Sequence, residues 1–380
     1  MMKNKKLSTI ADVAEKAGVS TATVSRMIND IGPISEITRE RVRDAIQELN
    51  YSPRRKRRGS GGSAGNAKSA GKTLAFLRIG SFVTNDRHPV TEHLIEALHA
   101  SAHAMGHKLT VHHVPDLKTC SVQDVIGDAK GVMIRASNEQ EVIQQSAKWL
   151  GNVPAVQVLG ENRSGRLWLD HVTPDNAQVG ALAAEYLMEQ GCDRLIFAAT
   201  NLYCGVGVER CVAFVNTACE AGKNVQVVVE TMQGSEKYFQ QGLSGHEVEC
   251  HVTRNRMEMI KKITSAKQKR FGLFVPTDLE LAMVMTQLQL LGVDFGKSAR
   301  AIGCDHETRC LSGLDPMPAT LDLHLGNIAE RAIRRVTHRI EHPDQPLVRI
   351  SVSPTLVHPR DVMNPRDPVD SFPPDEIASR

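Results

Sequence analysis

Two short helical patterns joined by a turn occupy residues 8–29, which read STIADVAEKAGVSTATVSRMIN. The first pattern places apolar residues on one helix face at the spacing i, i+3, i+4 and i+7, namely Ile10, Val13, Ala14 and Ala17. Gly18 stands where a chain that leaves a helix often needs a left-handed residue. Ser20 is placed to cap a second helix. The stretch therefore predicts a helix-turn-helix.

A small apolar core is expected around these helices. The second helix would bury Val24, Met27 and Ile28. A third helical pattern follows, with its apolar repeat at Val42, Ala45, Ile46 and Leu49. Three such helices can close a core, although one of this size is only marginally stable alone. We expect an all-α, three-helix head over residues 7–58 that ends in a basic arm.

The outer face of the second helix carries residue types that read a DNA major groove. Arg26 can donate two hydrogen bonds to guanine, and the small residues Thr21, Ala22 and Ser25 can meet a thymine methyl or let the backbone approach. We expect phosphate contacts from three further polar residues, Ser20, Thr23 and Asn29. The alternative is an ordinary helical hairpin with a polar face. The caps, the turn glycine, the apolar spacing and the basic tail together favour DNA binding.

Charge is divided unevenly along the chain. Residues 1–72 hold fifteen Lys and Arg against seven Asp and Glu, whereas the whole chain holds 46 against 43. A basic head on a mildly acidic body suits the binding of a polyanion. The densest basic run supplies four expected DNA contacts, Arg54, Arg55, Arg57 and Arg58. Part of this region is alternatively a solvated linker, because residues 59–65 are rich in Gly and Ser. We assign residues 59–72 to a flexible linker.

Several classes of protein are disfavoured by the sequence. The basic start does not lead into a continuous apolar run of the signal-peptide type, and no stretch is long and apolar enough to span a bilayer. The eight cysteines form no CxxC pair, which favours reduced thiols in a cytoplasm. His and Cys residues gather around Cys250 and Asp305, but their spacing matches no closed zinc pattern. We expect no cofactor, no metal, no membrane contact and a cytoplasmic, nucleoid-associated protein.

From Lys72 onward, short apolar runs alternate with helical patterns. The expected strands are residues 74–79, 108–114, 131–134, 153–159, 194–199, 225–229, 271–275 and 299–303. The expected helices are residues 91–105, 176–190, 212–222 and 279–291. Such alternation predicts parallel sheets covered by helices on both faces. In folds of this kind the ligand lies beyond the carboxyl ends of the strands.

Residues 7–360 resemble the lactose/galactose repressor (LacI/GalR) family of bacterial transcription regulators. The head carries the family pattern at Thr9–Ala14, Ala17–Ser20, Thr23–Arg26, Asn29 and Asn50–Pro53. The body carries looser matches in the right order, at Asp175-Asn176, Gly180, Tyr186-Leu187, Gly191, Arg210 with Phe214, Thr277-Asp278 with Ala282, and Gly303-x-Asp305. Within the head pattern, Thr9 and Tyr51 join the expected DNA contacts. Residues 361–380, rich in proline, are expected to be disordered.

The resemblance implies a periplasmic-binding-protein-like body of two parallel-sheet α/β subdomains, joined by three crossings around a cleft. The implied subdomains are residues 73–172 plus 322–333, and residues 173–321 plus 334–360. Family members act as homodimers, so two heads would meet a roughly palindromic operator on double-stranded DNA. A small-molecule effector in the cleft would change operator affinity. That is allostery only if effector and DNA favour different states.

Candidate ligand contacts follow from the same resemblance. Arg210 and Asp305 match positions that hold ligand in this family, and Thr277 falls where the family often has Asn. An Arg and a carboxylate fit a polar ligand such as a sugar or a nucleobase. His171 lies just before the match at Asp175, and His88 follows the first expected strand. Each of these two histidines either faces the cleft or is an ordinary polar residue of a surface loop.

Three departures from the family pattern bear on function. Arg57 and Ser60 replace the Ala and Leu of a short hinge helix, so a basic arm along the minor groove or the phosphates is expected in place of a leucine wedge. Ala213 replaces a usual Gly beside the candidate arginine. Cys304 and His306 replace the usual aromatic and second acid in the loop that carries the candidate aspartate. The last two departures leave the effector unidentified.

The sequence favours a sequence-specific, dimeric DNA-binding transcription regulator, expected to act as a repressor, with a ligand-sensing body. A periplasmic-type solute-binding protein is an alternative that requires a signal peptide. A non-specific DNA-binding protein is a second alternative, and it would bind without sequence preference. An enzyme would need a nucleophile elbow, a phosphate-binding glycine loop or a metal triad, and the sequence offers none of these motifs. We therefore expect no enzyme activity.

Overall fold

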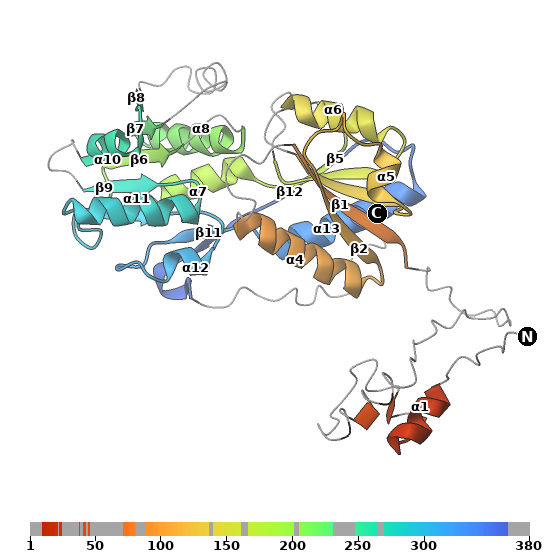
Figure 1. Cartoon of the computed structure of the whole chain (residues 1–380). Coiled ribbons are helices and arrows are strands. Elements are labelled where there is room, and N and C mark those ends of the chain that lie inside the picture. Colours follow the sequence, from red (N-terminus) through yellow and green to blue (C-terminus); the bar gives the residue numbers. More distant parts are fainter. Residues whose placement is uncertain are drawn as a thin grey trace, which may run out of the picture. The chain divides into compact units, whose positions relative to one another are not determined.

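The computed structural model of the chain divides into two compact units, Met1–Lys68 and Ser69–Arg380 (Figure 1). It describes residues 10–21, 23–24, 38, 41–42, 45, 71–80, 89–136, 140–160, 166–200, 205–230, 248–264 and 270–363. The smaller unit contains the predicted head, and the larger unit contains the predicted body.

The first helix of the head, α1, spans Ile10–Ala17 and ends in a left-handed turn. Gly18 has a φ of 63°, and the Val19 N–H donates to the Ala14 carbonyl at 3.0 Å. This is the six-to-one bond of a Schellman motif with glycine just beyond the helix. The next helical stretch begins after Ser20, whose Oγ accepts from the Thr23 N–H at 3.1 Å. The predicted turn glycine and N-cap are therefore confirmed.

All three expected helices of the head contribute to one apolar core. Its buried members are Val13, Ala14, Ala17, Val24, Val42 and Ala45, with Val19 packed against them. Residues 38, 41, 42 and 45, in the third expected segment, are helical. Of the expected core residues, Met27, Ile28, Ile46 and Leu49 lie outside the described residues. The three-helix prediction is confirmed by the segments that the structure describes.

The first lobe of the body contains a six-stranded sheet in the order β12-β5-β4-β3-β1-β2, with every neighbouring pair parallel. Its strands are β1 (Thr73–Ile79), β2 (Lys108–Val114), β3 (Gly131–Ala136), β4 (Ala155–Val158), β5 (Asp170–Pro174) and β12 (Arg349–Val352). Helices α4 (Pro89–Ala104) and α13 (Leu325–Glu341) cover one face. The short helix α5 (Val122–Ile126) and α6 (Gln140–Leu150) pack on the other face.

The second lobe contains a five-stranded parallel sheet in the order β10-β9-β6-β7-β8. Its strands are β6 (Arg194–Ala199), β7 (Asn224–Val229), β8 (Glu249–Val252), β9 (Phe271–Phe274) and β10 (Ala299–Ile302). One face packs against α7 (Asn176–Glu189) and α8 (Gly205–Glu220). The other packs against α10 (Arg256–Thr264) and α11 (Asp278–Leu290). The shorter elements are α12 (Thr308–Leu311), the antiparallel pair β11 (Thr320–Asp322) and β13 (Thr355–Val357), and η1 (Pro359–Asp361).

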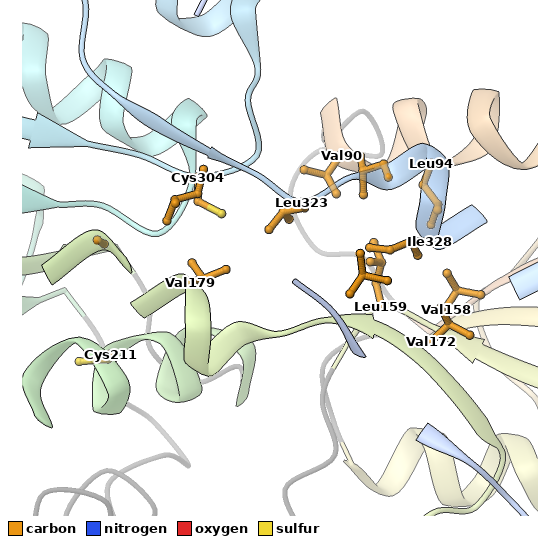
Figure 2. Close-up of a cluster of buried hydrophobic side chains, with 14 of the residues drawn as sticks. Val90, Leu94, Val158, Leu159, Val172, Val179, Cys211, Cys304, Leu323 and Ile328 are labelled. Carbon is orange, nitrogen blue, oxygen red and sulfur yellow. The ribbon is translucent and has the colours of Figure 1, made fainter. Parts of the chain in front are cut away.

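Three segments carry the chain between the lobes, from β5 to α7, from β11 to α13 and from β12 to β13. One buried apolar cluster continues across this junction. Figure 2 shows Val179 and Cys304 of the second lobe on one side, Val90 of the first lobe on the other, and Leu323 of a crossing segment between them. The lobes are therefore joined by a packed core as well as by the chain.

The eight expected body strands are present, each within two residues of its expected bounds. Three of the four expected helices match as closely, whereas α8 begins at Gly205, earlier than the expected start at residue 212. The sequence does not predict the remaining elements, which are strands β5, β8, β11, β12 and β13, helices α5, α6, α10, α12 and α13, and η1. Most of them are short, and α13 is rich in charge.

The internal division of the body needs one correction. Residues 334–360 had been assigned to the second subdomain, but α13 runs without a break to Glu341 and packs its buried face on the first lobe. Strand β12 pairs in parallel with β5, also in the first lobe. Hence residues 334–352 belong to the first lobe, since a continuous helix and a paired strand cannot be cut at residue 333. The outer domain boundaries remain predictions.

Candidate functional site

Two arginines lie side by side near the carboxyl ends of adjacent strands in the first lobe. Arg78 on β1 and Arg135 on β3 are register partners in a parallel pair, so their side chains leave the same face of the sheet. Arg135 Nη1 donates to Thr91 Oγ1 in the first turn of α4. Burial, followed by the nearby charge of Arg78, lowers the pKa of Arg135 to about 10, while the charge of Asp305 acts in the opposite direction.

Two acids of the second lobe meet these basic groups. Asp305 and Glu307 lie in the loop after β10, and Glu307 Oε2 is 3.1 Å from Nδ1 of His93 on α4. The Glu307 side chain is 3% exposed, and neither of its carboxylate oxygens accepts a hydrogen bond from a described residue. The lobes thus meet with opposite charge. We refer to Arg78, His93, Arg135, Asp305 and Glu307 as the interlobe site.

Asp278 fixes the loop that carries both acids. This buried carboxylate accepts from the Glu307 N–H at 2.7 Å and from Thr320 Oγ1 at 2.8 Å, and the Asp278 N–H donates to the Cys304 carbonyl at 2.8 Å. A Cβ at Gly303 would lie 2.0 Å from Asp278 Oδ1. The Thr277-Asp278 and Gly303-x-Asp305 patterns therefore lie in contact, because Asp278 packs against the loop that follows Gly303.

The same loop has an unusual backbone. Asp305 has a φ of 105° and His306 a φ of 51°, conformations that cost a non-glycine residue about 1–3 kcal/mol each and that gather at ligand sites and switch regions. Hydrogen bonds hold the loop in place, because the Asp305 N–H donates to the Leu321 carbonyl at 2.9 Å and the His306 N–H donates to Thr320 Oγ1 at 3.2 Å. The second lobe presents its acids from a strained but firmly held backbone.

Two other candidate ligand residues converge on this loop. Arg210 is buried on α8, where its Nε donates to Asn176 Oδ1 at 3.0 Å and its Nη1 to the Pro276 carbonyl at 2.6 Å. Thr277 caps α11, with its Oγ1 accepting from the Glu280 N–H at 3.2 Å. Burial raises the pKa of the Cys304 thiol well above its usual range. The nearby charge of Arg210 lowers that pKa, and the charge of Asp305 raises it. The ligand roles of these residues remain predictions.

The two candidate histidines have different outcomes. His171 is fully buried on β5, with its Nε2 3.0 Å from the Leu159 carbonyl oxygen, so it is not the surface-loop residue that one alternative predicted. Burial lowers the pKa of His171 to about 4, which leaves the ring neutral at pH 7. Its role as a ligand contact remains a prediction. His88 lies outside the described residues.

Sequence reasoning missed Arg78, Arg135, His93 and Glu307. A signal existed for the two arginines, because each comes next to the end of an apolar run already predicted as a strand, where ligands bind in parallel α/β folds. No comparable signal existed for the other two. Their elements, α4 and the loop after β10, meet only when the chain folds.

Three of the expected DNA contacts are described, at the start of the second helical stretch. Ser20 and Thr21 are exposed and Thr23 is partly exposed. Ser20 Oγ lies 2.9 Å from Thr23 Oγ1 in addition to its capping bond, so this hydroxyl already has local partners. The other expected contacts lie outside the described residues: Thr9, Ala22, Ser25, Arg26, Asn29, Tyr51, Arg54, Arg55, Arg57 and Arg58.

Residues 9–54 match the family model described as "Bacterial regulatory proteins, lacI family". Over 360 residues the chain is 26% identical to the HTH-type transcriptional repressor PurR of Erwinia tasmaniensis, covering 94% of this chain and 97% of the relative. Residues 9–54 are thus similar to the DNA-binding head of the lacI family, and the whole chain is similar to the PurR repressors. It is also 24% identical over 358 residues to PurR of Mannheimia succiniciproducens, covering 92% of this chain and 97% of the relative.

Solved structures show the same fold as this chain. The lac repressor dimer bound to operator and the anti-inducer ONPF matches with a TM-score of 0.60 at 18% identity, covering 93% of this chain and 98% of that chain. The CelR–cellobiose complex, a transcriptional regulator, matches with a TM-score of 0.58 at 19% identity, covering 92% and 98%. The predicted fold class, a helix-turn-helix head with a periplasmic-binding-protein-like body, is confirmed.

The described ranges, 10–363 with their gaps, contain no helix long and apolar enough to cross a membrane. In the same ranges no group of three or more His, Cys, Asp or Glu residues is arranged to hold a metal ion.

Proposed function

We propose that this chain is a sequence-specific transcriptional repressor whose affinity for an operator is set by a small polar ligand at the interlobe site. The observation that carries the proposal is the capped helix-turn-helix within the lacI-family match at residues 9–54. The named relatives are transcriptional repressors. One fold relative holds cellobiose and another holds operator DNA.

The proposed partners are double-stranded DNA, a small-molecule effector and a second copy of the chain. A dimer would place one head on each half of a roughly palindromic site, the arrangement expected for helix-turn-helix proteins. The operator-bound lac repressor is described as a dimer. Its likeness to this chain supports the proposal at the level of the fold. The proposed place of action is the bacterial nucleoid, and no enzyme activity is proposed.

The interlobe site would let the effector act on the arrangement of the two lobes. Basic groups come from α4, β1 and β3, and acids come from the loop after β10, so a ligand there contacts both lobes at once. Such a ligand favours the lobe arrangement that it bridges best. It changes operator affinity only by the difference in its affinity for the two arrangements.

Selection of genomic fragments with the purified full chain tests the proposed function. The recovered fragment is expected to bind roughly a thousandfold or more tightly than a shuffled competitor of equal length. The Arg26→Ala variant should lose about 1–3 kcal/mol on that fragment and relax one base preference. An exposed arginine of α13, in Arg334→Ala, provides the control. Equal binding of recovered and shuffled DNA over several salt concentrations would contradict the proposal and favour a non-specific DNA-binding protein.

A further inference from the structure

We propose that His107 is a pH-sensitive clamp on the segment by which the head joins the body, holding that segment when the ring is neutral and releasing it when the ring is protonated. The clamped segment consists of Gly71 and Lys72, the two residues directly before β1. We refer to these two residues as the linker root. The inference goes beyond the proposed function, because it requires neither an operator nor an effector.

The linker root packs against the turn between α4 and β2. A Cβ at Gly71 would lie 1.9 Å from the Gly106 carbonyl oxygen, so the two backbones are in direct contact. The Lys72 carbonyl accepts from the Lys108 N–H at 3.0 Å, and the Lys72 N–H donates to His107 Nδ1 at 3.2 Å. A side-chain nitrogen, and not a neighbouring strand, therefore holds the Lys72 amide.

This hydrogen bond is possible in only one state of the imidazole ring. The Nδ1 atom of His107 accepts a hydrogen bond only when it carries no proton, so the neutral ring has its proton on Nε2. That Nε2 lies 3.4 Å from Thr337 Oγ1 on α13, and the ring therefore bridges the linker root and α13. Protonation of Nδ1 places a second N–H against the Lys72 N–H, and two donors cannot bond to each other. Acid therefore breaks this contact.

The charged groups around the ring agree with this direction. Burial, followed by the charge of Lys72, lowers the pKa of His107, whereas the charge of Glu341 raises it. Lys72 Nζ and Glu341 Oε1 form an ion pair at 2.6 Å, and this pair lowers the pKa of the Glu341 carboxyl. The ends of the packed elements carry further titratable groups, which are His103 on α4, Lys108 on β2, His338 on α13 and His342 just beyond it. The ring is therefore neutral at pH 7.5, and it gains its proton below the ordinary histidine pKa of about 6.5.

The clamp lies at the end of two helices that begin at the junction between the lobes (Figure 1). Helix α4 contributes Thr91 and His93 to the contacts of the interlobe site, and α13 follows the crossing segment after β11. With 16 and 17 residues, each helix is about 25 Å long. The turn after α4 and the C-terminal end of α13 hold the linker root. Release of the linker root therefore weakens the mechanical connection between the head and the lobes.

Hydrogen exchange of the full chain at single-amide resolution tests the clamp at pH 7.5 and pH 4.5. Each rate is divided by the intrinsic rate at the same pH, so that only protection is compared. Protection of the Lys72 amide should fall about fivefold or more at the lower pH, because its acceptor is lost. The amides of Phe76 and Leu77, on a strand paired on both sides, report any general loss of structure and should change less than about twofold.

Variants distinguish a titrating clamp from a merely structural contact. His107→Asn keeps an amide oxygen near the position of Nδ1 but does not titrate, so it should protect the Lys72 amide at both pH values. His107→Leu removes the acceptor and should give weak protection at both. His99→Asn, at an exposed histidine of α4, is the control and should keep the pH response of the parent.

Three outcomes would overturn the inference. They are equal protection of the Lys72 amide in the parent at both pH values, an equal fall in His107→Asn, and full protection in His107→Leu at pH 7.5. The last comparison decides the matter if His107→Asn does not fold. No DNA enters this experiment, so its failure leaves the proposed repressor untouched. Likewise, a chain without preference among DNA sequences would refute the repressor and leave the clamp in place.

Discussion

The two lobes share one parallel α/β architecture, yet they are held together by different forces. In the first lobe a buried ionic cluster ties α13 to β5, because Asp170 accepts from Arg339 Nε at 2.9 Å, from Arg335 Nη2 at 3.0 Å and from the Val348 N–H at 2.8 Å. The second lobe instead has three aromatic rings in tilted and edge-to-face contact, those of Phe197, Phe214 and Phe274, with centroids 5.4–6.2 Å apart.

The same contrast extends to the interlobe site. The first lobe presents basic side chains from regular elements, whereas the second presents acids from a loop held by hydrogen bonds around Asp278. Buried ion pairs therefore stabilise the first lobe, whereas apolar contacts and hydrogen bonds stabilise the second. Acid should distinguish the two lobes, since the buried ion pairs of Asp170 lie in the first lobe.

The largest effect is expected from Asp170→Asn. It leaves two buried guanidinium groups without their counter-charge, and breaking a buried pair from one side costs about 3–5 kcal/mol. The free energy of unfolding, measured with urea, checks this value. The control is Asp193→Asn, which removes an exposed pair with Lys223 at 3.4 Å and should cost less than about 1 kcal/mol. Equal losses in the two variants would contradict a special role for the buried cluster.

Acidification should weaken the same cluster. Burial by itself raises the pKa of Asp170, but the hydrogen bonds from Arg339 and Arg335 outweigh it and hold that pKa below its ordinary value. A carboxyl group with a lowered pKa in the folded state contributes stability above its unfolded pKa of about 3.9, and loses that contribution as the pH falls through its folded pKa. Asp170→Asn should therefore flatten the loss of stability between about pH 5 and pH 2. Parallel curves for parent and variant would exclude Asp170 as a cause.

The second lobe should respond instead to added volume. At Gly180 on α7, a Cβ would lie 2.1 Å from the Arg210 carbonyl oxygen and 2.8 Å from the Phe214 backbone nitrogen. Gly180→Ala must therefore separate α7 from α8, at a cost of about 1–3 kcal/mol in free energy of unfolding. Gly313→Ala, where a Cβ meets nothing within 4 Å, is the matched control. The prediction fails if both alanine variants unfold at the same urea concentration as the parent.

Hydrogen bonding in the second lobe is tested by Thr320→Val. The substitution keeps the shape of the side chain but removes a donor to Asp278 and an acceptor for the His306 N–H. A loss of about 1–3 kcal/mol is expected, because buried groups are left without partners. Thr286→Val supplies the comparison, since that hydroxyl donates to the Ala282 carbonyl on the exposed side of α11. A Thr320→Val variant as stable as Thr286→Val would show that the loop is held by other contacts.

Much of this organisation could be predicted from the sequence, and the limits have physical causes. Strand β1 and helix α7 were predictable because their apolar residues follow a regular period within one segment. Helix α13 was missed because its arginines, Arg335 and Arg339, look like a solvated face until Asp170 of a distant strand meets them. The Glu307 carboxylate was missed for the same reason, since its burial depends on α4.

The subdomain error has a related origin. The sequence around residue 333 contains no Gly or Pro to mark a boundary, and the three crossings can be located only from the pairing of β12 with β5. By contrast, the cap and turn of the head were predictable because Gly18 and Ser20 act on their immediate neighbours. Local chemistry was visible in the sequence, whereas pairing over long separations required the fold.

The smallest effect is expected in the head, which serves as a reference outside both lobes. Ser20→Ala removes the acceptor of the Thr23 N–H, and loss of such a cap costs about 1 kcal/mol. Amide exchange at Thr23 and Val24 should accelerate roughly fivefold, while amides of the two sheets in the body keep their rates. Ser20→Asp retains a capping oxygen and should restore slow exchange at Thr23. Unchanged exchange in Ser20→Ala would show that the second helix begins without help from this side chain, and faster exchange in either sheet would show that the head is coupled to the lobes.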